Sequence, residues 1–514
     1  MASSYTVGRS QLLFALCLPL AILLGYLLSD PLDRENSLVA LLMVGMLSIP
    51  LLMRGYHVAL IFAWNAAITP VVLPGQPFLW VPLACLGLGF AVINRFVNPE
   101  ARFVSVPAVS KPLLFLLLVV IGTAAFRGGF GLRSFGSESY GGRDYVYIVA
   151  AILGYFALSS QRIPIPSTNR YVGLYFLTGL TGLVPNLAYL GGSSYYFLFY
   201  LFPPLYAFEQ ARGDFSLEMQ ITRIFGLTAA SSALFCWVLG KYGLRRIFQL
   251  SRPWPAIVMF VAFMGCAFCG FRSLLIIFAL TLAFQLWFER LFTLRVVGSL
   301  FGVFLVGGAL LIPNAHRLPL VVQRTMSFLP LHLSPVVEMS AQGSTTWRLQ
   351  MWQELLPEIP KYFFMGKGFA IDPTELAFAE QNSQRFGIGY EGSMAAGDYH
   401  SGPLSLIIPL GIGGVIAFLW FIYAGTKYLH YQYKHGAPEL RVINTFLLAY
   451  FVARFVFFVT IFGGFFSDLA IFTGVVGLSV SLNGESVPQS IEPDVVAAPE
   501  EHESGYAGRL VNTI

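Results

Sequence analysis

The chain has 514 residues, of which 56% are hydrophobic, 15% aromatic and only 11% charged. Soluble domains carry about 25% charged residues, whereas the mean hydropathy of this chain is +0.70. This composition excludes an ordinary soluble protein and indicates an integral membrane protein. The formal net charge of +5 comes mostly from turns between apolar runs, so it does not indicate a nucleic-acid partner.

The apolar runs predict an all-α polytopic membrane protein with about 14 spans, since one span needs roughly 20 apolar residues. One large polar loop, 314–402, separates the eleventh and twelfth spans, and the acidic tail 483–514 is expected to be disordered. The predicted spans are 11–29, 37–53, 57–73, 78–96, 112–126, 145–160, 171–190, 224–241, 255–271, 273–289, 296–313, 403–423, 441–462 and 466–482.

Short turns rich in Lys and Arg indicate the cytoplasmic side of a membrane. With both termini in the cytoplasm, every such turn falls inside, while the acidic turn 30–35, the Gly-rich loop 127–144 and the loop 314–402 fall outside. The basic turns lie at Arg54, 95–111, 162–170, 241–252, 290–295 and 427–441.

The segment 195–208 is apolar and aromatic, but it is short, and Pro203-Pro204 interrupts it. If this segment crossed the membrane, the later topology would be inverted and the basic turn 241–252 would lie outside. We therefore expect a re-entrant or interfacial segment on the outer side.

Common cofactor and metal signatures are absent from the sequence. It contains no P-loop, dinucleotide fingerprint or nucleophile elbow, and its histidines lack metal-ligand spacing. The cysteines all lie in apolar runs, which favours packing over a disulfide framework or zinc site. No metal or cofactor is predicted.

The loop 314–402 has a helical pattern of its own. Ser344 or Thr345 is a candidate N-cap, Trp347, Met351 and Leu355 recur at helical spacing, and Pro357 ends the pattern. We expect an amphipathic helix that lies on the membrane or covers the bundle.

Three residues on the outer side are candidates for chemistry on a phosphorylated lipid. Arg272, between two apolar runs, either holds a phosphate in a bidentate manner or simply anchors a helix end. Arg348 is either a second phosphate ligand or a solvated surface residue. His400, where the loop meets the next span, is either a general base or an interfacial hydrogen-bonding group, and Asp398 is positioned to orient it.

Other charged residues are candidates for substrate binding. Arg454 lies inside an apolar run, where an isolated cation is costly, so we expect it to pair with Asp468 as a structural ion pair or as part of the substrate site. Lys367 and Arg385 are weaker candidates, because the glycines around Lys367 fit a turn as well as an anion site.

Several short motifs, in order, resemble the O-antigen ligase and Wzy polymerase superfamily of GT-C-type membrane glycosyltransferases. The similarity covers roughly 255–423 and departs from the family pattern at Phe271, in place of Ser, and at Ser401, in place of Asn. The motifs are Phe271-Arg272-Ser273, Arg348 followed by Trp352, Gly366-Lys367-Gly368, His400-Ser401 and the Gly-rich run 410–414.

The resemblance implies a metal-independent, inverting transfer of a glycan from undecaprenyl pyrophosphate to an acceptor hydroxyl, at the periplasmic face of a bacterial inner membrane. It implies that His400 is the base and that Arg272 and Arg348 hold the pyrophosphate. Substrate binding would fall to Arg454, Lys367, Arg385, Asp398 and Trp352. It divides the chain into an N-terminal bundle, 1–254, and a ligase-like domain, 255–482.

The acceptor is left open by the sequence. A ligase would use lipid A core, a Wzy-type polymerase would extend an O-antigen or exopolysaccharide, and a protein O-oligosaccharyltransferase would use a protein. A non-enzymatic polysaccharide or lipid transporter is a further alternative, which predicts broken helices, polar residues at the membrane midplane and internal repeats. Only Arg454 and the segment 195–208 favour a transporter, and no repeat is visible.

Overall fold

The computed structural model describes residues 34–97, 104, 106–131, 140–215, 221–249, 251–386 and 390–484, with a few positions between 18 and 26. These residues are helical or irregular, and they include no β-strand beyond one isolated bridge between Tyr140 and Ile371. The predicted span 11–29 falls mostly, and the predicted tail almost entirely, outside the described residues.

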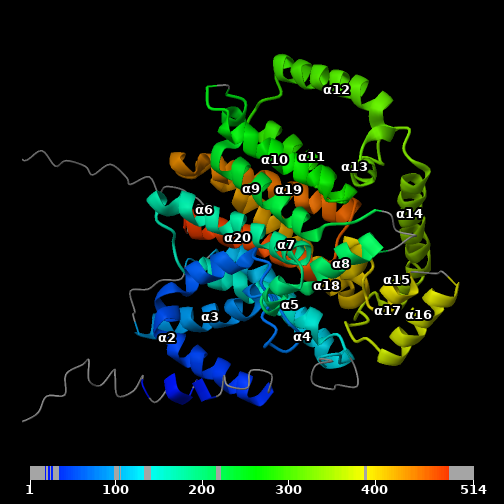
Figure 1. Cartoon of the computed structure of the whole chain (residues 1–514). Coiled ribbons are helices and arrows are strands. Elements are labelled where there is room, and N and C mark those ends of the chain that lie inside the picture. The colour runs from blue at the N-terminus through cyan, green and yellow to red at the C-terminus, as the bar shows by residue number, and fades with distance from the viewer. Residues whose placement is uncertain are drawn as a thin grey trace, which may run out of the picture.

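The helices form a bundle with a set of additional helices at one end (Figure 1). Those of the first half are α2 (Arg34–Trp64), α3 (Trp80–Val97), α4 (Pro107–Arg127), α5 (Gly142–Ser159), α6 (Thr168–Leu177), α7 (Leu183–Gly191), α8 (Pro204–Phe215) and α9 (Phe225–Ile247). The bundle continues with α10 (Trp254–Phe268), α11 (Arg272–Phe288), α18 (Gly402–His435), α19 (Arg441–Thr460) and α20 (Phe465–Asn483), whereas α12 (Leu294–Asn314) lies apart from it (Figure 1).

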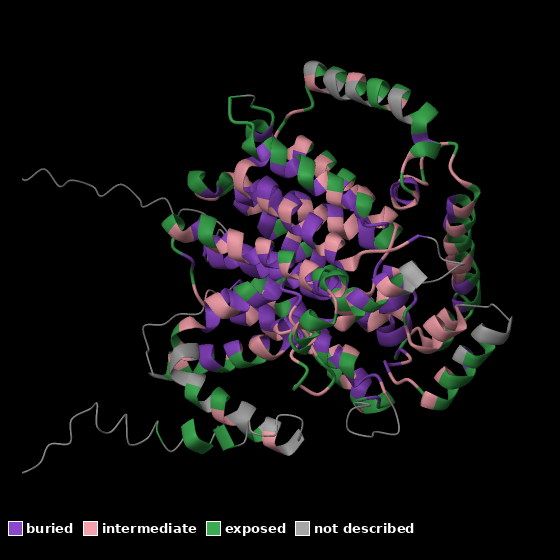
Figure 2. Cartoon of the chain, in the orientation of Figure 1, coloured by how far each residue is buried: buried purple, intermediate pink, exposed green. Residues whose placement is uncertain are grey.

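The predicted loop contains α13 (Leu320–Thr325), α14 (Pro335–Leu355), α15 (Glu358–Tyr362), α16 (Pro373–Phe386) and α17 (Glu391–Ala395). We call these the loop helices, and the end of the bundle that they cover the loop end (Figure 1). Figure 2 shows many exposed and half-buried residues on these helices, whereas the bundle interior is buried. A soluble assembly at one end of an apolar bundle agrees with the sequence pattern.

Five helical segments are long and apolar enough to cross a membrane: Pro107–Arg127, Ile165–Gly191, Gly402–His435, Pro438–Thr460 and Phe465–Asn483. Shorter apolar helices run over Trp80–Phe96, Trp254–Phe268 and Arg272–Phe288. The fold is therefore all-helical with several candidate membrane crossings.

The region around Arg54 differs from the prediction. The sequence predicts spans 37–53 and 57–73 with a turn between them, but α2 runs without a break from Arg34 to Trp64. Only Arg54, Gly55 and Tyr56 separate the two predicted spans, and none of these residues stops a helix that continues on both sides. The residues after Trp64 are irregular, since their backbone pairs with other segments, as in the bond from Thr69 N to Leu201 O (2.8 Å).

Several predicted basic turns meet at the opposite end of the bundle, which we call the basic end. The Glu289 carboxylate accepts hydrogen bonds from the amides of Leu244 (2.8 Å) and Arg245 (3.1 Å). Tyr433 Oη donates to Phe288 O (2.8 Å), and Ile163 N donates to Ser481 O (2.7 Å). The bonds of Glu289 and Tyr433 bring together the turns that follow α9, α11 and α18, and the bond of Ile163 joins the turn after α5 to the end of α20.

The segment 195–208 starts and ends at the loop end. It forms a 3₁₀ helix, Ser193–Tyr200, a short turn and the start of α8, so it is not one continuous helix. Asn186 Nδ2 in α7 donates to Tyr206 O (3.0 Å), and its Oδ1 accepts from Gly226 N in α9 (3.1 Å). Since α7 ends where α9 begins, the segment returns to the end of the bundle from which it starts, and its re-entrant or interfacial place at a membrane stays a prediction.

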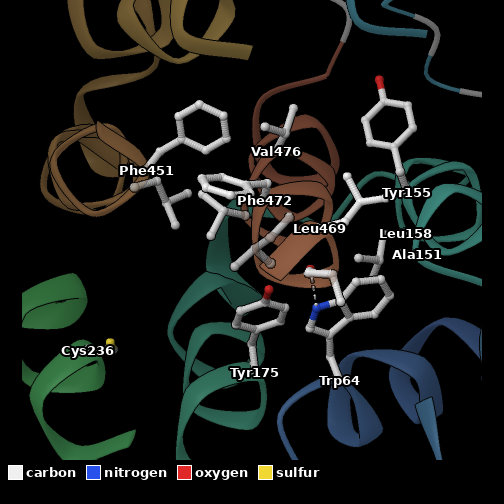
Figure 3. Close-up of a cluster of buried hydrophobic side chains, with 14 of the residues drawn as sticks. Trp64, Ala151, Tyr155, Leu158, Tyr175, Cys236, Phe451, Leu469, Phe472 and Val476 are labelled. Carbon is white, nitrogen blue, oxygen red and sulfur yellow. Dashed lines mark hydrogen bonds between the residues drawn. The ribbon is translucent and has the colours of Figure 1, made fainter. Parts of the chain in front are cut away.

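The core joins helices from both halves of the chain. The helix α5 packs along α20, α4 packs along α18, and α9 contacts α10 and α19. Figure 3 shows Trp64 of α2 among buried rings from α5, α6, α19 and α20, with its indole N–H donating to Ala470 O (3.1 Å). The C-terminal helices α19 and α20 are thus held in place by helices from the N-terminal half of the chain.

The helix α18 is broken near its first third, and a loop segment completes the break. Pro409 lacks an amide hydrogen, and Gly411 has a left-handed φ of 64°, which leaves nearby carbonyls without helical partners. Lys367 N donates to Ile408 O (2.7 Å) and Gly368 N donates to Pro409 O (2.9 Å). Gly366-Lys367-Gly368 is therefore a docking turn between the loop helices and the bundle.

The helix that contains Arg348 begins earlier than predicted. Pro335 opens α14, whereas Ser344 and Thr345 lie in its middle and donate hydrogen bonds back to Ala341 O (3.2 and 3.1 Å). They are not N-caps, because a run of helix-compatible residues precedes them. The predicted C-terminal limit at Pro357 agrees with the end of α14 at Leu355.

The geometry of the docking turn leads to a testable prediction for Gly366. Its φ is 68°, and a methyl group at this position would overlap the Pro409 carbonyl. We expect Gly366→Ala to destabilise the protein by at least about 1–2 kcal/mol, the cost of a left-handed conformation alone. Thermal unfolding of the purified protein in detergent measures this effect.

The matched control is Gly343→Ala, in the middle of α14, where a methyl group meets nothing within 4 Å. This substitution should leave stability unchanged or raise it by about 0.5–1 kcal/mol, since Ala is the better helix former. Equal melting temperatures for the two variants would refute the docking role of Gly366.

Candidate functional site

Arg272 opens α11 at the loop end. Gly270 (φ 79°) allows the tight turn from α10, and the extended Phe271 directs the chain into the new helix. Arg272 Nη2 donates to Ser344 Oγ (2.6 Å) and, more weakly, to Ala341 O (3.4 Å) of α14. The predicted cation at the bundle edge therefore contacts the predicted loop helix directly.

Arg348 lies one helical turn after Ser344, on the same side of α14. Its guanidinium carbon is 5.6 Å from the centroid of the Phe462 ring, and its Nε is buried without a hydrogen-bond partner in the described part of the chain. A buried N–H without an acceptor is costly, and the half-buried Arg348 side chain is not a fully solvated surface residue.

His400 lies between two aromatic rings and beside a carboxylate. Its ring centroid is 5.1 Å from that of Trp347 and 5.3 Å from that of Phe462. Its Nδ1 lies 2.8 Å from Asp398 Oδ1, which confirms the expected pairing. An Asp that accepts from Nδ1–H leaves Nε2 with a free lone pair, the arrangement of a general base.

The backbone around His400 is held in an uncommon conformation. The φ of His400 is 51°, in the left-handed region that a non-glycine residue rarely adopts. Trp352 Nε1 donates to the carbonyl of the preceding Tyr399 (2.9 Å), which fixes the segment from the α14 side. Such strain is retained only where the surrounding contacts enforce it.

Phe462, just beyond α19, is a residue that sequence reasoning missed. Its ring contacts both His400 and Arg348, so it links the candidate base to the candidate cation. No sequence signal distinguishes it from other phenylalanines in the apolar runs. With this ring and Ser344, the structure brings Arg272, Arg348 and His400 into one site.

Two further arginines join the cation cluster. Arg324 of α13 is 6% exposed, and Arg223 lies just before α9 with its guanidinium carbon 5.9 Å from the Phe271 ring centroid. Burial lowers the pKa of Arg324 to about 9, and the charges of Arg223, Arg272 and Arg348 add to this effect. Both arginines lie beside the predicted outer ends of spans. This position is the sequence signal that could have identified them as candidates.

The pKa of Arg348 is lowered by the same neighbouring positive charges. Burial lowers this pKa first, and the positive charges of Arg272 and Arg223 lower it further, whereas Asp398 acts in the opposite direction. Like charges held together in a partly dry site attract an anion strongly, because each arginine is stabilised when negative charge arrives. We call Arg223, Arg272, Arg324 and Arg348 the arginine cluster.

A second carboxyl group approaches from α5. Burial raises the pKa of Asp144 to about 6, Arg143 lowers it, and the negative charge of Asp398 raises it. Asp144 precedes the predicted span 145–160 and was not singled out in the sequence. It adds a second acidic group near the histidine–aspartate pair.

The other predicted cations lie elsewhere. The amides of Lys367 and Gly368 are used by α18 carbonyls, so this turn does not form an anion-binding nest, and the Lys367 side chain lines a separate cavity. Arg385 belongs to α16, and its side chain is outside the described residues.

Arg454 forms the predicted ion pair inside the bundle. Its Nη2 lies 2.7 Å from Asp468 Oδ1, and Asp468 Oδ2 accepts from Gly464 N (2.9 Å) at the start of α20. Arg454 also lines a cavity of about 330 Å³ together with Ser273 and Phe462, next to Arg272 and His400 respectively. The pair thus connects α19 to α20 directly beneath the arginine cluster and the histidine.

Comparisons with known proteins add no assignment. No protein-family model matches the chain, and no curated protein matches it. The resemblance described above rests on the sequence motifs alone.

Proposed function

We propose that the protein is a membrane glycosyltransferase that moves a glycan from undecaprenyl pyrophosphate to an acceptor hydroxyl at the periplasmic face. One observation carries the proposal: a crowded arginine cluster lies beside a histidine–aspartate pair at the loop end of an apolar bundle. This combination suits a substrate with a strongly anionic group on a lipid and a hydroxyl that must lose a proton.

The arginine cluster supplies the charge for the donor. As the bond between the sugar C1 and the phosphate oxygen breaks, negative charge grows on the departing pyrophosphate. Arg348 offers a buried N–H without a partner, and Arg272 exchanges its bond to Ser344 for one to a phosphate oxygen. Fixed cations in a partly dry site stabilise this charge without having to reorganise.

His400 supplies the base for the acceptor. Its Nε2 takes the proton of the acceptor hydroxyl while that oxygen attacks C1 from the side opposite the leaving group, which inverts the anomeric centre. Asp398 holds the ring through Nδ1 and stabilises the imidazolium that forms. The products are the new glycoside and undecaprenyl pyrophosphate.

The orientation follows from the charge distribution. Basic turns that meet at the end opposite the loop helices support a cytoplasmic basic end and a periplasmic loop end. In this scheme the chain crosses an inner membrane several times, through the long apolar helices of the bundle. The ion pair between Arg454 and Asp468 then lies inside the membrane, where pairing offsets the cost of each charge.

A transporter explains the same features less well. The break in α18 would serve as its ion or substrate site, but the freed carbonyls of Ile408 and Pro409 are occupied by the Gly366–Gly368 turn. Enzymes of the proposed superfamily that use lipid A core, a growing polysaccharide or a protein share the same donor chemistry.

The base assignment is tested with His400→Ala. General-base assistance is worth about 10²–10⁴-fold, so release of undecaprenyl pyrophosphate from a labelled lipid-linked glycan should fall by that factor. The variant should keep the melting temperature of the unaltered protein within a few degrees. His332→Ala, which removes an exposed histidine of the same loop, serves as the control. Near-normal release by His400→Ala would rule out the mechanism.

The arginine cluster is tested by the binding of inorganic pyrophosphate to the purified protein. Pyrophosphate should raise the melting temperature, and Arg324→Gln should weaken its apparent affinity roughly 10–100-fold, the value of one or two charge-assisted hydrogen bonds. The unliganded variant should be at least as stable as the unaltered protein, because one of the repelling charges is gone. Arg317→Gln, which removes an exposed charge nearby, should change neither quantity. An unaltered pyrophosphate response in Arg324→Gln would remove Arg324 from the site.

A further inference from the structure

A second cavity, of about 660 Å³, lies among α14–α17 and the start of α18. Its volume falls in the range of small-molecule sites, which is roughly 300–1,000 Å³. The charged groups that line it are Glu354, Glu358, Glu375, Glu391, Lys361 and Lys367. Carboxylates thus outnumber ammonium groups by two to one, the reverse of the arginine cluster.

Some of these carboxylates have a hydrogen-bond or ion-pair partner, and others have none within the described residues. Tyr390 Oη donates to Glu354 Oε1 (2.6 Å), and Lys361 Nζ lies 3.4 Å from Glu358 Oε1. Within the described residues, the side chains of Glu375 and Glu391 have no hydrogen-bond or ion-pair partner. The cavity therefore offers free acceptors for hydroxyl or ammonium groups.

The cavity also has aromatic walls. Tyr362, Phe378 and Tyr399 line it together with Asn382. Burial raises the pKa of the Tyr399 phenol, and the negative charges of Glu358 and Glu375 raise it further. Flat apolar faces beside hydrogen-bonding groups suit a sugar ring, which has C–H faces and a polar edge.

One chain segment joins this cavity to the candidate base. Tyr399 lines the acidic cavity, and the next residue, His400, lies beside Arg348 through their shared contact with Phe462. Neighbouring Cα atoms are about 3.8 Å apart, so the wall of the cavity at Tyr399 is directly continuous with the backbone of His400. The cavity is thus placed where the acceptor of the proposed transfer must enter.

We propose that this cavity is the acceptor subsite and takes a phosphate-free glycan end, with amino sugars favoured over acetylated ones. The identification as an acceptor subsite rests on the proposed function. Negative lining repels phosphorylated acceptors, while the arginine cluster attracts the pyrophosphate donor, so the two substrates are sorted by charge. A heavily phosphorylated lipid core is disfavoured, and the end of an amino-sugar-containing glycan is favoured.

The test measures binding to the full-length protein in nanodiscs without any donor. The probes are chitotriose, which carries amino groups, its N-acetylated form and the same acetylated trisaccharide phosphorylated at one O6. We expect affinity to decrease in that order. The double variant Glu375→Gln/Glu391→Gln should weaken chitotriose binding by about three- to tenfold, as expected for partly exposed charge pairs.

The matched control is Glu338→Gln, which removes an exposed carboxylate of α14 outside the cavity and should leave chitotriose binding unchanged. Tighter binding of the phosphorylated probe, or no response to the double variant, would overturn the subsite. Charge-dependent chitotriose binding without release of undecaprenyl pyrophosphate in the donor assay would retain the glycan site and refute the transfer reaction.

Discussion

The break in α18 is the constraint on which the arrangement of the site depends. Backbone groups freed within an apolar bundle must find partners, because no water is there to replace them. Here the partners are the amides of Lys367 and Gly368, so the helix break also fixes the loop helices to the bundle. The loop helices consequently form a fixed cover over the bundle and not an independent domain.

This docking brings together residues that are far apart in the sequence. Arg272 of the bundle bonds to Ser344 of the cover, and Phe462 of the bundle contacts Arg348 and His400 of the cover. Each contact is modest alone, but together they hold several like charges and one strained histidine next to one another. An arrangement that costs stability in the free protein is expected where a ligand supplies the missing charge.

Much of the fold and part of the candidate site could be predicted from the sequence. Apolar runs and charge bias predicted most of the helices, the polar cover and the pair between Arg454 and Asp468, because each follows from burial or charge cost. Local patterns failed at α2 and at the start of α14, where possible turn and cap residues were tolerated inside helices. Arg324, Phe462 and the acidic cavity depend on tertiary contacts between distant segments, which one sequence does not display.

We propose that the arginine cluster and His400 form one site for a lipid pyrophosphate. An experimental structure with undecaprenyl pyrophosphate bound tests it most directly. We predict that the two phosphates lie within hydrogen-bond distance of Arg272 and Arg348, with the His400 ring facing the terminal phosphate. Phosphates bound elsewhere, with Arg348 Nε still without a partner, would contradict the account.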